Sequence, residues 1–126
     1  MPFEISHDTN NHMIFGKFSG VIKLEILREY VVEMKKFCNP GSIQRIMTDY
    51  REAQINLSTL ELFQLPERHD RLLMSMGFNV HRIKRAILYD PQDSASATFF
   101  ETVALNRGHM VKIFTDENKA REWLMD

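Results

Sequence analysis

The stretch RAILYD at residues 85–90 decides the fold class of this chain. Its apolar run at 86–89 is too short for a helix but long enough for a strand. Because the apolar residues do not alternate with polar ones, we expect an interior strand that is covered on both faces. The strand should end at Asp90, since the following Pro91 has no N–H to donate to a neighbouring strand.

Further elements can be placed on either side of this strand. Turn-forming residues at 8–11 separate two extended stretches, which predicts a hairpin. Ser58 and Glu61 form a capping-box pattern that should begin a helix. The expected strands lie at 3–6, 13–18, 43–50, 85–90 and 109–114. The expected helices run from 24 to the turn at 39–42, from 58, from 66 to 76, from 93 or 94 to 108, and from 115 or 116 onward, where Ala120, Trp123 and Leu124 should pack inward.

The order of these elements is ββαβαβαβα, within a single domain that covers residues 1–126. Each connection between the last four strands has room for a helix, so these strands should be parallel with right-handed crossovers. The first strand is then antiparallel, at one edge of the sheet. The sequence therefore predicts an α/β fold with a mostly parallel four- to five-stranded sheet and an antiparallel edge strand.

Composition excludes several classes of function. The net charge is −1, so no overall basic field attracts nucleic acid. No apolar run reaches the length that crosses a membrane, and we expect no integral membrane association. The single cysteine, Cys38, cannot form an internal disulfide and the N-terminus has no signal-peptide pattern, so we expect a cytoplasmic protein.

Sequence motifs for chemistry are missing. The five histidines show no metal-ligand spacing, there is no nucleophile–base set, and neither glycine-rich phosphate motif occurs. We therefore expect no enzymatic activity, no catalytic residues, no cofactor and no metal.

The chain resembles a known family in three features. These are the order ββαβαβαβα, the opening strand–Gly20–helix, and the stretch FTDE at 114–117 followed by Ala120, Trp123 and Leu124. They resemble the SpoIIAA-like family, which belongs with the STAS domains and is distantly similar to CRAL-TRIO lipid-binding domains. The resemblance covers nearly the whole chain. It implies a sheet with helices mainly on one face, and a non-enzymatic role in protein partnering or in holding a small apolar ligand.

One departure from the relatives bears on regulation. Antagonist STAS domains carry a phosphorylatable serine just after the strand that matches 43–49. The corresponding stretch here is DYREA at 49–53, which has no serine or threonine. The resemblance therefore does not carry the phosphoserine switch over to this chain.

The carboxyl ends of the strands supply one group of candidate ligand-binding residues. Asp49, Tyr50 and Arg51 end one expected strand, and Asp90 ends the next. Ligands of parallel α/β sheets tend to lie at these ends, where paired carboxylates could share a proton or hold Mg²⁺. The alternative, which we favour, is that these residues cap and turn the chain.

Ser94 and Ser96 form a second candidate. They open the expected helix after the interior strand, where small residues let a ligand approach and free N–H groups favour an anion. The alternative is a capped helix start that packs closely, and we favour this interpretation.

Met74, Met76 and Phe78 form a third candidate, within the stretch LLMSMGF at 72–78. The stretch is apolar on more than one side, and methionine adapts to irregular surfaces. It could gate a pocket, form a dimer contact or fill the core, and these alternatives stay open.

Two functions are expected. The leading one, which the resemblance implies, is a STAS-like regulatory or binding module that acts through protein–protein contact. The second is a carrier or sensor of a small apolar ligand or lipid. Apolar residues on both sides of the expected strand at 13–18, together with the stretch 72–78, also predict a homodimer that buries them.

Overall fold

The computed structural model of the chain describes residues 2–37, 39–93, 95, 97–98, 101–102 and 110–126. Its strands are β1 (Phe3–Asp8), β2 (Met13–Ile22), β3 (Arg45–Ile55), β4 (Lys84–Leu88) and β5 (Met110–Phe114). Its helices are α1 (Leu24–Phe37), α2 (Thr59–Ser75) and α4 (Glu117–Met125), with short 3₁₀ turns at Pro40–Ser42 and Pro91–Asp93. Residues 95, 97–98 and 101–102 are helical, in the region where the sequence predicts a further helix.

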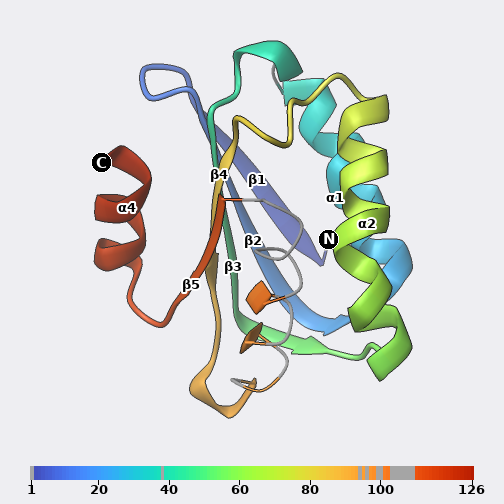
Figure 1. Cartoon of the computed structure of the whole chain (residues 1–126). Helices are drawn as coiled ribbons and strands as arrows, with labels where there is room; N and C mark the ends of the chain where they lie inside the picture. The colour runs from blue at the N-terminus through green and yellow to red at the C-terminus, as the bar shows by residue number, and fades with distance from the viewer. Residues whose placement is uncertain (1, 38, 94, 96, 99–100, 103–109) are drawn as a thin grey trace.

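The sheet confirms the predicted α/β fold. Its strands lie in the order β1-β2-β3-β4-β5, with β1 antiparallel to β2 and every other neighbouring pair parallel. Each parallel connection therefore moves one strand in the same direction. Right-handed crossovers of this kind place their helices on one face, and Figure 1 shows α1 and α2 together on that face, with α4 on the other.

The main core lies between the sheet and the pair α1 and α2. Phe3, Phe18 and Tyr30 form its aromatic centre, with ring centroids 4.8–5.7 Å apart. Tilted and edge-on contacts at such distances suit aromatic rings. Around them pack fully buried aliphatic residues from both helices and from β2 and β3.

A smaller core lies on the opposite face, beneath α4. Ala86 and Leu88 of β4 pack there against Ala120 and Leu124 of α4. Arg85 and Ile87 of β4 point to the α1 and α2 face instead, because successive side chains of a strand alternate. The unbroken apolar run that predicts β4 is therefore explained by burial on both faces.

Backbone carbonyls at the end of α4 are held by two cations from the sheet. Arg45 Nε donates to the Leu124 carbonyl at 2.7 Å, and Lys84 Nζ donates to the Trp123 carbonyl at 2.8 Å. Lys84 Nζ also lies 4.8 Å from the centre of the Trp123 ring. The last carbonyls of a helix lack partners within the helix, so these contacts fix α4 on the sheet.

Two expectations about the elements need correction. α2 is one helix from Thr59 to Ser75 rather than two pieces, and Pro66 lies inside it. Packing of Leu65 and Leu73 on the core holds the helix on both sides of the proline. β3 runs on to Ile55, so Asp49 lies within the strand and not at its end.

The strand expected at 13–18 does not leave a free apolar face. Ile14 and Phe18 belong to the main core, and Met13 belongs to the smaller one, with Phe15 partly buried against it. Both faces of β2 are therefore covered within one molecule. Among the described helices, none is long and apolar enough to cross a membrane.

Candidate functional site

A cavity of about 100 Å³ lies between the sheet and the helices α1 and α2. Side chains from α1, α2 and three neighbouring strands line it, and most of them are aliphatic. The polar side chains in its wall are Tyr30, Thr48, Tyr50, His69, Arg85 and Tyr89. Largely apolar hollows with a few polar groups are typical of sites for small molecules.

Strand alternation explains which residues reach the cavity. Thr48 and Tyr50 are two positions apart on β3, and Arg85, Ile87 and Tyr89 follow the same spacing along β4 and just beyond it. Residues at this spacing point to one face of a sheet. The wall of the cavity is thus set by the register of the parallel strands.

Tyr30 closes one side of the cavity, and the position of its ring requires a glycine in the facing strand. Its hydroxyl lies 3.4 Å from Thr48 Oγ1. A Cβ atom at Gly16 would lie 2.5 Å from Tyr30 Cζ, closer than real Cβ contacts come. Burial raises the pKa of Tyr30 to about 12, so its phenol stays protonated at neutral pH.

The predicted trio at 49–51 is divided between the two faces of the sheet. Tyr50 faces the cavity and stacks on Phe18, with ring centroids 4.8 Å apart and planes 16° from parallel. Burial raises the pKa of Tyr50 strongly. Asp49 and Arg51 lie on the opposite face, where Arg51 is 3.6 Å from Glu117 of α4.

Asp49 and Arg51 form a closed ion pair. Arg51 donates from Nε to Asp49 Oδ1 at 3.0 Å and from Nη2 to Asp49 Oδ2 at 2.8 Å. Burial alone would raise the pKa of Asp49, but the hydrogen bonds from Arg51 outweigh it, and the pKa of Asp49 is lowered. Such a two-bond arrangement occupies both oxygens and suits a structural role.

Asp90 takes part in a local turn. Its Oδ1 accepts a hydrogen bond from the Gln92 backbone N–H at 2.9 Å. Within the described part of the chain, no group of three or more His, Cys, Asp or Glu side chains is arranged to hold a metal ion. The alternative in which these strand-end residues shape the chain therefore has geometric support.

Arg85 is a polar residue of the cavity that the sequence did not single out as a site residue. It belongs to the basic run at 81–85, yet its side chain is only 8% exposed. It lies 3.7 Å from Asp70 of α2, measured from Nη2 to Oδ1. Burial lowers the pKa of Arg85, and the attraction of Asp70 offsets only part of this effect. The sequence could have predicted this position, because residues 85 and 87 are two apart on one strand and therefore point to the same face of the sheet.

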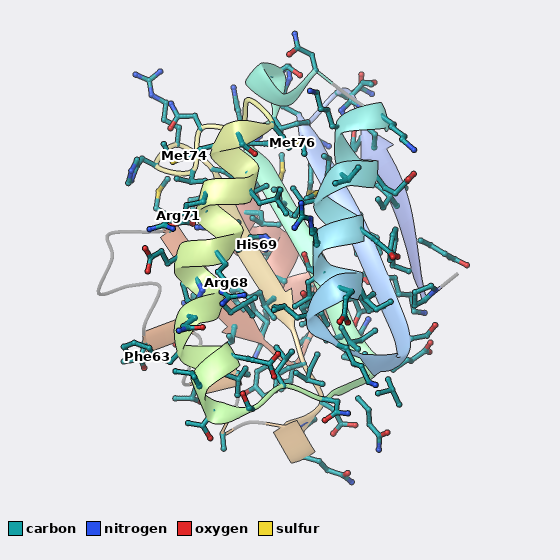
Figure 2. The ribbon with its side chains drawn as sticks, turned by 90° about the vertical axis from the view of Figure 1, so that its right-hand side faces the viewer. Phe63, Arg68, His69, Arg71, Met74 and Met76 are labelled. Atoms are coloured by element: carbon teal, nitrogen blue, oxygen red, sulfur yellow. The ribbon has the colours of Figure 1, made fainter. Side chains whose placement is uncertain are left out.

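A groove of about 630 Å³ lies over the cavity, between α1 and α2. The groove and the cavity share Leu27, Leu65 and His69 in their walls. Figure 2 shows Arg68 and His69 pointing from α2 toward α1. Groove and cavity are therefore adjacent hollows, and the groove has a basic rim.

The other predicted residues lie away from both hollows or outside the described residues. Met74 is 57% exposed on the outer side of α2, Met76 is partly buried against the main core, and Phe78 is buried within it. None of these three lines the cavity or the groove. Ser94 and Ser96 lie outside the residues that the structure describes.

Comparison with known proteins shows a likeness in fold. No family model matches the sequence, and no match was found among the curated proteins. Among solved structures, the chain is similar to an uncharacterized protein from the DUF3478 family with a SpoIIAA-like fold, from Shewanella loihica PV-4, at a TM-score of 0.57. The two chains are 17% identical, and the match covers 97% of this chain and 91% of that chain. At this identity the likeness concerns the fold alone, and it agrees with the motifs at 114–124: the chain has a SpoIIAA-like fold.

Proposed function

We propose that this chain is a non-enzymatic binding module that holds a small apolar ligand in the cavity beneath α1 and α2. The observation that carries the proposal is the cavity itself, an apolar hollow inside the main core that adjoins a groove at the surface. A ligand that fills an apolar hollow of this kind gains close packing contacts with the side chains that line it.

The chemistry of the cavity wall supports binding rather than catalysis. Burial raises the pKa of Tyr30 and of Tyr50, so neither phenol ionises readily. The Thr48 hydroxyl lies against the Tyr30 hydroxyl, and the described wall includes no cysteine, lysine or carboxylate. A nucleophile activated by a base, the usual requirement for covalent catalysis, does not fit this wall.

A titration with 1-octanol, a neutral apolar probe, tests the proposal. Two-dimensional NMR on the full chain should show saturable shifts of the methyl groups of Leu27, Leu65 and Ile87, which line the cavity. The variant Ile87→Phe fills the cavity and should abolish the shifts. The control Val21→Phe adds the same ring at an exposed position and should leave them intact. The proposal is refuted if the wild type shows no saturable shifts, or if the shifts are the same in Ile87→Phe and Val21→Phe.

Contact with a second copy of the chain is the second candidate, since the sequence favours protein partnering. Leu60, Phe63 and Met74 are 63%, 60% and 57% exposed and share the outer side of α2. Figure 2 shows Phe63 and Met74 pointing away from α1, with Arg71 between them. This surface replaces the strand at 13–18 as the basis for the expected homodimer.

The outer side of α2 is suited to a two-fold contact. A pair of antiparallel α2 helices centred on Glu67 sets Leu60 against Met74 and Phe63 against Arg71 of the other copy. Glu67 and Arg71 form an ion pair in each copy, so the centre is neutral. Light scattering over a range of concentrations should give a dimer that Phe63→Glu converts to a monomer, while Val21→Glu does not. A wild-type monomer at every concentration contradicts this candidate.

A further inference from the structure

We propose that Arg85 binds the carboxylate of the ligand, so that the cavity selects a medium-chain monocarboxylic acid over neutral or cationic molecules of the same length. This inference rests on the proposed function, and it adds the chemical class of the ligand and the residue that recognises it.

The Arg85 guanidinium has donor atoms that the described residues do not use. Its Nε and Nη2 atoms are buried and make no hydrogen bond within the described part of the chain. The carboxylate oxygen with which Nη2 forms an ion pair, Asp70 Oδ1, is 3.7 Å away, beyond hydrogen-bond range. A buried donor without an acceptor is costly, so this edge of the guanidinium is suited to an incoming oxygen.

The same molecule shows how a guanidinium edge can be filled. On the opposite face of the sheet, Arg51 uses Nε and Nη2 to bind both oxygens of Asp49 at 3.0 and 2.8 Å. Nε and Nη2 form the corresponding edge of Arg85, which is one of the residues that line the cavity. Two parallel N–H groups match the two oxygens of a carboxylate.

The charges around the cavity favour an anion at this point. Among the described residues of the wall, Arg85 is the one with a fixed formal charge, since Asp70 lies outside the wall. Asp70 compensates the buried cation only in part, as the lowered pKa of Arg85 indicates. The carboxylate of a ligand would add to the attraction of Asp70 and offset more of the cost of burying Arg85. An ammonium group would be repelled by Arg85.

The shape of the hollows sets the length of the ligand. The cavity alone, at about 100 Å³, suits only a small group, but it adjoins the groove through Leu27, Leu65 and His69. A short alkyl chain with its carboxylate at Arg85 can extend between Leu27 and Leu65 toward the groove. Each buried methylene should raise the affinity about fourfold, until the tail reaches solvent.

A head-group series measured by calorimetry on the full chain tests the inference. Octanoate should bind at least about tenfold more tightly than 1-octanol, because charge-assisted hydrogen bonds to a buried guanidinium are strong. Octylamine should show no binding. Equal binding of octanoate and 1-octanol overturns the carboxylate inference and leaves the proposed function standing. If neither octanoate nor 1-octanol binds, the carboxylate inference and the proposed function are both overturned.

Paired variants locate the head group. The double variant Arg85→Met/Asp70→Asn removes both members of the buried pair, so that no charge is stranded, and it should bind octanoate and 1-octanol equally. Arg68→Met removes a cation from the groove and should keep the preference for octanoate. The opposite pattern, with the preference lost only in Arg68→Met, places the carboxylate at the rim and overturns the inference.

A measurement on the wild-type chain does not depend on whether the double variant folds. Octanoate should move the Nε–H proton resonance of Arg85 downfield relative to protein saturated with 1-octanol, because a charge-assisted hydrogen bond forms at that atom. An unchanged Arg85 resonance at saturating octanoate overturns the inference.

Discussion

Replacing Gly16 by alanine should strain the wall of the cavity through Tyr30. The added Cβ would lie 2.5 Å from Tyr30 Cζ, and an ordinary contact begins at 3.4 Å, so the ring must move by about 1 Å. The ring is fully buried, with Phe3 and Phe18 at 5.6 and 4.8 Å between centroids and Thr48 at the hydroxyl. It can therefore move only by giving up these contacts and entering the cavity that it borders.

The magnitude follows from two opposing effects at Gly16. Overpacking in a close-packed core costs about 1–3 kcal/mol. Alanine in a strand recovers about 0.5–1 kcal/mol of the conformational entropy that glycine loses on folding. Urea unfolding followed by circular dichroism should thus give a free energy of unfolding lowered by about 1–2 kcal/mol. Gly41→Ala is the control, because the contact that its Cβ would make among the described residues is with Asn39 Oδ1, at an ordinary 3.6 Å.

A double-mutant cycle assigns the effect to the ring. In a Tyr30→Leu background the obstructing atoms are gone, so Gly16→Ala should become neutral or stabilising. If Gly16→Ala costs nothing in the wild-type background, or costs the same in both backgrounds, the reasoning about Tyr30 is refuted.

Other predictions concern α4, α2 and the ion pair on the opposite face. Leu124→Ala should lower the free energy of unfolding by about 2–5 kcal/mol in a urea titration, since Leu124 is fully buried under α4. Trp123→Ala should cost less than the roughly 3–5 kcal/mol of a core tryptophan, because Trp123 is only partly buried, and a cost as large would contradict its placement. In the wild type, the ionised Asp49 contributes stability above about pH 4, and this contribution is lost as the pH falls through the lowered pKa of Asp49. Asp49→Asn lacks this contribution, so acid unfolding of the variant should be less pH-dependent. Ser58→Ala should cost about 1 kcal/mol by breaking the capping box, and an unchanged melting temperature would argue against that cap.

The sequence was a good guide to the fold because each element carries its own local signal. The run at 86–89 identified a strand buried on both faces, and Ser58 with Glu61 marked the start of α2 correctly. Element ends were less certain, because tertiary packing carries α2 across Pro66 and pairing extends β3 past Asp49. Local patterns do not contain these long-range contacts.

The site was harder to predict, because side-chain surroundings depend on which faces meet. Side-chain alternation along a strand predicts that Tyr50 lies on the opposite face of the sheet from Asp49 and Arg51, and that Arg85 lies on the same face as Ile87. It does not tell which face the helices α1 and α2 cover. No local pattern pairs Arg85 with Asp70, which come from different elements, or tells the exposed Met74 from the buried Phe78.

Contacts between a bound ligand and the protein test the central claim most directly. Intermolecular nuclear Overhauser effects between octanoate and the full chain should connect its methylenes to the methyl groups of Leu27, Leu65 and Ile87, which line the cavity. Effects confined to the exposed side chains of Leu60 and Phe63 on the outer side of α2 would contradict a ligand site beneath α1 and α2.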